Sequence, residues 1–536
     1  MKKLFQNLWS FLKLNGDTFL KILFAGALAA QFLSFVPLIS GFMDHRSIVE
    51  AHDNDAGKMV EVGGNSRWYN DNQFRYYGPL YFRLANTLHS VAPTFSGKYV
   101  TDSREAQEES VHFYLMLISL IGIYLLAGSC SYLLSSRWDL RFLSTLFLVP
   151  LFLKHDVWIQ YVLIAHPDFL LTGLSALSVL LTVQMIQKNF SDKSIHWAGY
   201  AWGATLCTKL SVLFFMPGIG LIFYIFSKDF KETYTRAKSF TFRAVALYLI
   251  LGFPQNFDIF GSLRKLIRLS EFSSGFTWSS FVDWWGYIGT QSFYGLIVIV
   301  VISLLLSERV PIKLSIKKSL AVFIALNIGL LLLTSRTIEL SHTYYGLPFI
   351  AALLVSTVFV LQNFRFGYFV ERFHSQIFVS LFLFVIFMMG ASFDLFSFPK
   401  AAALQRQNLT CRNYHREIYD KTNAWLKEDQ KMISTPYTPV PLYDEDKVQV
   451  HWEMNFEKLI ESKVNLLIFN RSYYARYTDT ESPTKYVLIT NPEWKKTQDF
   501  YLAFYKKENA NIENSGEWKK IYNAENCSIE IWQRTH

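Results

Sequence analysis

The sequence predicts an α-helical multi-pass membrane protein of about eleven spans, followed by a small soluble α/β domain. Composition is the first reason: 51% of the 536 residues are hydrophobic, 17% are aromatic and only 18% are charged, which is too apolar for an ordinary soluble chain. The second reason is that apolar segments recur from Thr18 to about Phe396, many of them near the ~20 residues that cross a bilayer core. The third is that mixed polar sequence follows Pro399. We therefore expect a membrane domain over residues 1–396 and a separate domain over residues 397–536.

Lys and Arg residues predict the orientation of the chain. The positive-inside rule places the segments 1–21, 137–141, 188–193, 228–243, 309–318 and 365–372 in the cytoplasm, because they hold nineteen basic residues against six in the short segments of the other side. The expected spans are 18–42, 111–135, 140–153, 168–187, 196–209, 211–227, 244–256, 292–307, 319–334, 344–362 and 376–396. With an odd number of spans and a cytoplasmic N-terminus, the C-terminal domain and the largest loop, 43–110, are expected outside. The expected location is a bacterial inner or plasma membrane.

One lysine stands inside an apolar run. Lys209 lies within the thirty-residue segment Trp197–Phe226, both of whose flanks are expected in the cytoplasm. The chain must then cross and return as two short spans, which places Lys209 near the outer turn. An ammonium group in a cavity open to the outside can stay solvated and meet an anion. The alternative is a lysine that reaches the lipid headgroups without binding a substrate.

Acidic residues mark the outer loop 43–110. Asp44 comes directly after the first expected span, so its carboxylate is expected at the membrane surface, where it could take a proton as a general base. Asp55 is an alternative base, as are Glu50 and Asp53. Any polar loop contains acidic residues, so position alone does not separate a catalytic carboxylate from a solvated one.

Other polar and aromatic residues are expected on the same outer side. Residues 72–84 have helical apolar spacing interrupted by Gly78 and Pro79, which indicates an interfacial helix that contains Tyr77. His166 precedes Pro167 and Asp168, and Asp168 is expected in the first turn of a span, where the helix dipole favours a carboxylate. The last expected outer segment, which leads into the tenth span, supplies Arg336, His342 and Tyr345. A divalent metal is possible, but the spacing of these residues matches no specific ligand set.

The order of these features resembles the GT-C class of membrane glycosyltransferases, which use polyprenyl-phosphate sugars and include the protein O-mannosyltransferases and the aminoarabinose transferases of lipid A. The resemblance runs from Asp44 through the segments 77–81 and 203–209 to 342–348, and it covers most of residues 18–396. It implies that Asp44 is the catalytic base and that Lys209 binds the lipid phosphate. Many members have an Asp-Glu pair after the first span, whereas His45 follows Asp44 here.

The resemblance implies an inverting transfer in the assembly of a cell-envelope glycan. An acceptor hydroxyl on a lipid, glycan or protein would attack the sugar of a polyprenyl-phosphate donor, and Lys209 and Arg336 would stabilise the phosphate that leaves. No cofactor is expected. The net charge of +9 does not indicate a nucleic-acid partner, because the basic residues do not gather on one soluble face. The alternative function is a transporter or flippase of lipid-linked sugars, which predicts inverted repeats that the sequence does not show.

The segment 397–536 predicts a small α/β domain. Helical patterns over 416–428 and 452–461 alternate with strand patterns over 464–469, 485–490 and 528–533. Cys130 and Cys207 lie in apolar segments and are expected to be packing residues. Cys411 and Cys527 lie near opposite ends of this domain, so a disulfide between them is a reasonable expectation outside the cytoplasm.

Overall fold

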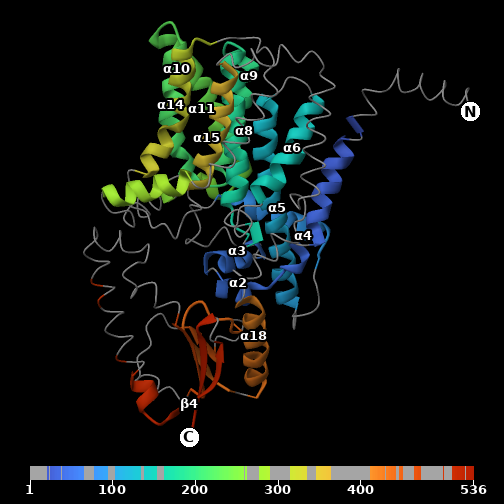
Figure 1. The fold of residues 1–536 in the computed structure, drawn as a ribbon, viewed down its shortest axis with the longest axis vertical. Coiled ribbons are helices and arrows are strands. Elements are labelled where there is room, and N and C mark those ends of the chain that lie inside the picture. The colour runs from blue at the N-terminus through green and yellow to red at the C-terminus, as the bar shows by residue number, and fades with distance from the viewer. Residues whose placement is uncertain are drawn as a thin grey trace, which may run out of the picture.

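The structure is a computed structural model that describes, with short internal gaps, residues 21–64, 78–94, 103–153, 162–261, 277–289, 314–334, 346–363, 411–441, 446–450, 464–471 and 510–535. Most of these residues form a helical bundle, and the segment from 411 onward forms a smaller unit with one β-sheet at one end of the bundle, called the C-terminal domain below (Figure 1). The bundle helices are α5 (Ser103–Leu134), α6 (Trp138–Leu153), α8 (Asp168–Gln187), α9 (Asp192–Leu206), α10 (Met216–Phe226), α11 (Phe230–Gly252), α14 (Ile316–Thr334) and α15 (Leu347–Asn363).

The centre of the bundle is formed by α5 and α8, which pack against each other along much of their length. Helix α6 packs on α5, α9 packs on α8 and α11, and α15 packs on α8 and α14. Small residues allow the closest approach: a Cβ atom at Gly122 of α5 would lie 2.0 Å from the carbonyl oxygen of Phe169 in α8. Both helices therefore bury most of their surface in the protein.

Three helices of the described part are long and apolar enough to cross a membrane: Phe24–Gly41, Ser103–Leu134 and Asp168–Gln187. Shorter apolar helices lie at Arg141–Leu153, Leu210–Phe226 and Leu347–Leu361. These segments coincide with predicted spans. The expected spans 292–307 and 376–396 lie outside the described residues, so the number of spans stays a prediction.

Two predicted boundaries differ from the structure. Helix α11 begins at Phe230, fourteen residues before the expected span 244–256, because Asp229 caps its N-terminus by accepting a hydrogen bond of 2.7 Å from the backbone N–H of Glu232. Helix α4 (Pro79–Val91) begins at the proline that was expected to interrupt it, since proline is well suited to the first helical turn. Tyr81 of this helix is fully buried, so α4 is partly a core helix.

The predicted break near Lys209 is present. Helix α9 ends at Leu206, and a 3-10 helix, η3 (Leu210–Phe215), leads into α10. The segment between α9 and η3 contacts the start of α4, where the N–H of Gly78 donates to the carbonyl of Thr208 over 2.8 Å. A Cβ atom at position 78 would lie 1.8 Å from the carbonyl oxygen of Cys207, so only glycine allows this approach.

Two short helices, α2 (Arg46–His52) and α3 (Asn54–Gly64), lie between the bundle and the C-terminal domain (Figure 1). They follow the first described helix after a short connection that contains Asp44. Helix α3 packs on α4 and α5, and α2 packs on α3, on α5 and on α18 of the C-terminal domain. The beginning of the loop expected over 43–110 is therefore folded onto the bundle.

The C-terminal domain has one helix, α18 (Cys411–Lys427), and a five-stranded sheet of order β2-β1-β3-β5-β4 among its described residues. The strands are β1 (Met432–Ser434), β2 (Val448–Val450), β3 (Leu466–Asn470), β4 (Trp518–Ala524) and β5 (Ile529–Arg534). Strand β1 pairs in parallel with β2 and β3, whereas β3–β5 and β4–β5 are antiparallel. Cys411 and Cys527 form the expected disulfide, with Cα atoms 5.2 Å apart.

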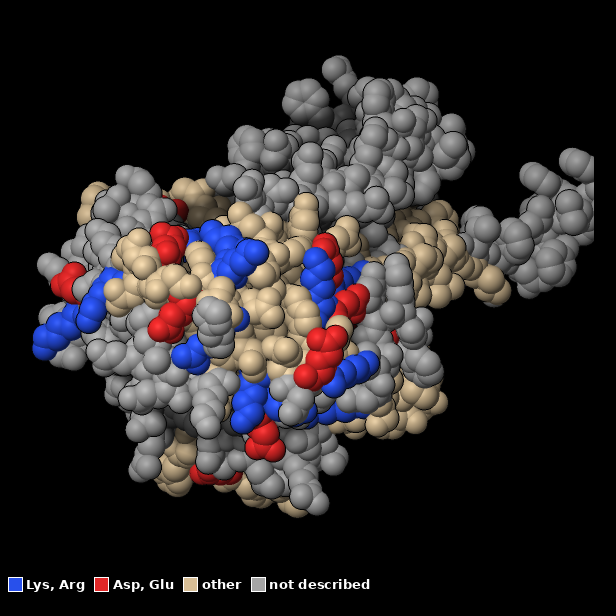
Figure 2. Space-filling model, turned by 90° about the horizontal axis from the view of Figure 1, so that it is seen from below, with Lys and Arg blue, Asp and Glu red and all other residues tan. Residues whose placement is uncertain are grey.

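The α/β character of this domain agrees with the sequence prediction. The patterns over 464–469 and 528–533 correspond to β3 and β5, and the helix expected over 416–428 begins five residues earlier, at Cys411. The segments 452–461 and 485–490 lie outside the described residues. Seen from the end of the molecule that carries this domain, the described acidic and basic side chains are interspersed rather than gathered by sign (Figure 2).

Candidate functional site

Buried polar side chains gather where the bundle meets the C-terminal domain. The side chains of Asp44, His45, Glu105, Glu108, Glu109 and His112 are all buried there. They come from the start of α5 and from the connection between the first helix and α2. Buried ionisable groups require partners, because desolvation of an uncompensated charge is unfavourable. The contacts of these residues therefore define the candidate site.

Asp44 is held from two sides and is only 3% exposed. Its backbone N–H donates to Nδ1 of His112 over 3.1 Å, and Nε2 of His112 lies 3.3 Å from the carbonyl oxygen of Leu163. These two contacts require the His112 tautomer that carries its proton on Nε2. On the other side, Arg416 of α18 donates from Nε to Oδ1 of Asp44 over 2.7 Å, and from Nη2 to the same oxygen. Asp44 is therefore fixed by both α5 and the C-terminal domain.

The same face of α18 makes further contacts with the bundle. Tyr419, three residues after Arg416, donates a hydrogen bond from its hydroxyl group to the carboxylate of Glu105. The centroid of its ring lies 4.3 Å from the centroid of the His45 ring. His415 is 4% exposed. Burial lowers the pKa of His415 to about 4, although the charge of Asp44 acts in the opposite direction. This imidazole is thus neutral at physiological pH.

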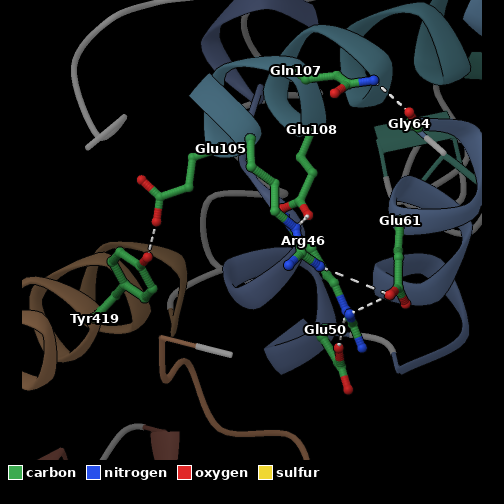
Figure 3. Close-up of polar contacts among 9 residues, drawn as sticks. Arg46, Glu50, Glu61, Gly64, Glu105, Gln107, Glu108 and Tyr419 are labelled. Atoms are coloured by element: carbon green, nitrogen blue, oxygen red, sulfur yellow. Dashed lines mark hydrogen bonds and ion pairs between the residues drawn. The ribbon is translucent and has the colours of Figure 1, made fainter. Parts of the chain in front are cut away.

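An ion-pair network braces the helices beside Asp44 (Figure 3). Arg46 of α2 contacts Glu50 over 3.0 Å and Glu61 of α3 over 2.8 Å, and its backbone N–H donates to Glu108 of α5 over 3.0 Å. Arg104 adds a second contact of 3.1 Å to Glu108. Burial raises the pKa of Glu50, and the nearby guanidinium of Arg46 offsets part of that effect. Because Glu50 and Glu108 are already paired with arginines, the network holds α2, α3 and α5 together.

The second polar group contains three of the predicted site residues. Nζ of Lys209 lies 2.9 Å and 2.8 Å from the two carboxylate oxygens of Asp168, and Nδ1 of His166 lies 2.6 Å from Oδ2 of Asp168. The exposed fractions are 2% for Lys209 and 0% for both His166 and Asp168. Lys209 was expected in a solvated cavity. That expectation is wrong for this structure, since a carboxylate from α8 compensates its charge inside the bundle.

Helix α5 connects the two groups. His112 contacts Leu163, whereas Ser119 donates to the carbonyl of His166 over 3.3 Å and lies 3.0 Å from the hydroxyl of Tyr81. Seven residues of α-helix rise about 10 Å. The Asp44 group and the Asp168–Lys209 group are therefore attached to α5 two turns apart.

Several predicted site residues are not described by the structure. Tyr77, Arg336, His342 and Tyr345 lie outside the described residues, and Asp55 lies in α3 with a side chain that is not described. The structure brings together His166, Asp168 and Lys209, and it places Asp44 in the neighbouring group.

Arg416, His112 and Glu105 belong to the site but were not predicted. For α5 a signal existed, because Glu105, Glu108 and His112 recur at intervals of three and four residues, which places them on one face of a helix. For Arg416 no signal existed, since it lies 372 residues from Asp44 in the chain.

The described residues contain one group with three potential metal ligands, namely Cys411, His415 and Cys527, whose ligand atoms lie within 4.8 Å of one another. The two sulfur atoms are joined in the disulfide. They are thus not thiolates, the form in which cysteine binds zinc. This group does not fit a metal centre in the oxidised protein.

Comparison with known proteins gives weak matches only. No model of a known protein family matches the sequence, and no curated protein matches it. Among solved structures, the chain is similar to ArnT from Cupriavidus metallidurans in the apo state, with 12% identity and a TM-score of 0.38, over 87% of this chain and 95% of that chain. It is also similar to the same protein bound to undecaprenyl phosphate, with 12% identity and a TM-score of 0.36, over 85% of this chain and 96% of that chain. At these values the functional argument rests on the residues of this chain.

Proposed function

We propose that the chain is an inverting glycosyltransferase that moves a sugar from a polyprenyl-phosphate donor to a hydroxyl group of a lipid, glycan or protein at the outer face of a membrane. The observation that carries the proposal is the setting of Asp44. It is a buried carboxylate directly after an apolar helix, and partners on two sides hold it in one orientation. Such a fixed carboxylate at the end of a membrane helix suits a general base.

In the proposed reaction, Asp44 takes the proton of the acceptor hydroxyl. The hydroxyl oxygen attacks the anomeric carbon from the side opposite to the phosphate, and the bond between that carbon and the phosphate oxygen breaks. The electron pair of this bond leaves with polyprenyl phosphate. One displacement of this kind inverts the configuration of the anomeric carbon.

Both polar groups contact helix α5. A single displacement needs the base and the leaving-group contacts on opposite sides of the sugar. Asp44 contacts His112 of α5, and the backbone carbonyl of His166 contacts Ser119, seven residues further along that helix. In the proposed arrangement the sugar lies between a base at Asp44 and a phosphate near Lys209.

Lys209 is proposed to bind the donor phosphate, and its ion pair with Asp168 restricts how it can do so. Its ammonium group already contacts both oxygens of Asp168. A phosphate must therefore replace one of these contacts, while the remaining contact to Asp168, whose carboxylate is also held by His166, keeps the lysine in place. Arg336, His342, Tyr345, Tyr77 and Asp55 remain proposed contacts to the phosphate, the sugar or the acceptor.

The experiment is transfer of a radiolabelled sugar from a panel of polyprenyl-phosphate monosaccharides by membranes that contain the chain. We expect one class of donor to be used and the product to have the inverted anomeric configuration. Retention of configuration would contradict the single displacement, and no transfer from any donor would contradict the function. No observation among the described residues favours the transporter alternative.

A further inference from the structure

A guanidinium group from the C-terminal domain lies on the candidate catalytic carboxylate. Nε and Nη2 of Arg416 both donate to Oδ1 of Asp44, and Nη2 also donates to the carbonyl oxygen of Met43 over 3.0 Å. The Arg416 side chain is 12% exposed and that of Asp44 is 3% exposed. The planar guanidinium therefore contacts both the side chain and the backbone of this short connection.

The fold holds Arg416 in this place through the rest of α18. Its first residue, Cys411, is covalently bound to Cys527, which lies two residues before the start of β5. Toward its middle, Tyr419 is hydrogen-bonded to Glu105 of the bundle. Arg416 lies between these two attachments, so the position of its guanidinium is set by the docked domain and does not depend on a flexible surface chain.

The chemistry of a buried base explains what such a contact can do. A carboxylate that is removed from water without a cation nearby tends to take up a proton, and a protonated carboxyl group cannot act as a base. A guanidinium at hydrogen-bond distance favours the ionised form and fixes its direction. The titratable or charged groups around this position include His415, Tyr419 and Asp420 of α18, Glu105, Glu108, Glu109 and His112 of α5, and His45 and Arg46 beside Asp44.

We propose that Arg416 is a positioning residue for Asp44, so that the C-terminal domain completes the catalytic site by fixing the orientation of this carboxylate. The inference rests on the proposed function. It assigns the domain a direct part in the reaction in place of a purely structural one. It also predicts that separation of the domain from the bundle lowers catalysis even when the membrane helices remain folded.

The test compares Arg416→Gln, Arg416→Lys and the control Lys421→Gln in the transfer assay, with kcat and the KM for the donor measured separately for each. Lys421 is on the same helix, where it forms an exposed ion pair with Glu417. We expect Arg416→Gln to lower kcat on the order of 100-fold, the effect of a small misplacement of a catalytic group. The KM for the donor should stay near the wild-type value, because Arg416 orients the base and does not bind the donor. Arg416→Lys should restore part of kcat, because it keeps the charge but not the planar fork that contacts both Asp44 and Met43, and Lys421→Gln should match the wild type.

Two results would overturn the proposal. The first is wild-type transfer by Arg416→Gln. The second is an equal loss in both Arg416 variants, or a loss that appears in KM and not in kcat, because neither fits a residue that orients the base. Folding is checked by the intact Cys411–Cys527 disulfide and by size-exclusion chromatography of the purified full chain.

A second measurement separates this proposal from the proposed function. The rate at which a protease releases the C-terminal domain is compared for wild type, Asp44→Asn, Arg416→Gln and the double variant. We expect the double variant to be released no faster than either single variant, because the two substitutions remove one shared contact. If the wild type transfers no sugar but the effects of the two substitutions on the release rate are not additive, the proposed function is contradicted and the contact between Asp44 and Arg416 is supported. If the effects are independent, the contact itself is contradicted.

Discussion

The buried pair of Asp168 and Lys209 gives a quantitative prediction. Each charge has the other as a partner at 2.8–2.9 Å, and the exposed fractions are 0% and 2%. Removal of one member leaves the other buried and uncompensated, which typically costs about 3–5 kcal/mol. Replacement of both residues by neutral side chains leaves neither charge in the core, so the double variant has no uncompensated charge. We therefore expect Lys209→Met and Asp168→Asn each to lower the free energy of unfolding by about 3–5 kcal/mol, and the double variant to be less destabilised than their sum.

The assay is equilibrium unfolding of the purified chain in detergent. It is measured for a double-mutant cycle that consists of wild type, Lys209→Met, Asp168→Asn and the double variant. The coupling energy should be about 2–3 kcal/mol, within the range for residues in direct contact. The exposed pair of Glu417 and Lys421 is the control, and its coupling should be about 0.5 kcal/mol or less. If Lys209→Met alone is as stable as wild type, or if the two effects simply add, the pair does not compensate its charges as argued here. Any loss of donor use in a Lys209 variant must be corrected for this loss of stability.

Three further predictions concern other positions. Gly78→Ala should destabilise the protein by about 1–3 kcal/mol in the same unfolding assay, because the new Cβ would lie 1.8 Å from the carbonyl oxygen of Cys207; unchanged stability would refute the close approach. The free energy of unfolding of the C-terminal domain should fall by up to about 3 kcal/mol as the pH falls from 6.5 toward 4, because His415 binds a proton in the unfolded chain but not when it is buried. Thermal unfolding at several pH values measures this dependence, and the substitution His415→Asn should remove it. Reduction of the Cys411–Cys527 disulfide should destabilise that domain by about 2–5 kcal/mol, as measured by its thermal unfolding with and without a thiol reductant; equal transitions would contradict this.

Local sequence signals predicted several parts of the fold. Apolar length gave the positions of α5 and α8, and the Pro167–Asp168 step marked the start of α8, because proline and a carboxylate both suit a helix N-terminus. The break near Lys209 followed from the length of its apolar run. In the C-terminal domain, β3 has a continuous apolar run and β5 alternates apolar and polar residues at its start, and the sequence predicted both strands. Strands β1 and β2 have three residues each, which is too short for a recognisable pattern.

The contacts of the site depended on distant parts of the chain. Lys209 was interpreted from its neighbours in sequence, which suggested a solvated ammonium group, but its partner Asp168 lies 41 residues away. The expectation that both residues face one side of the membrane was not enough to predict a direct ion pair. Arg416 could not be predicted, because no local pattern reports which helix of a separate domain docks beside Asp44. Helical periodicity limits which residues share a face, whereas tertiary packing decides which faces meet.

The most direct test of the account is sugar transfer by Asp44→Asn, measured beside wild type with the donor that the panel identifies. The substitution keeps the shape of the side chain and removes its ability to accept the acceptor proton. We predict that the variant folds, retains the Cys411–Cys527 disulfide and loses at least about 100-fold in kcat, the usual contribution of a general base. Transfer at the wild-type rate by a folded Asp44→Asn protein would show that Asp44 is not the base and would contradict the central claim.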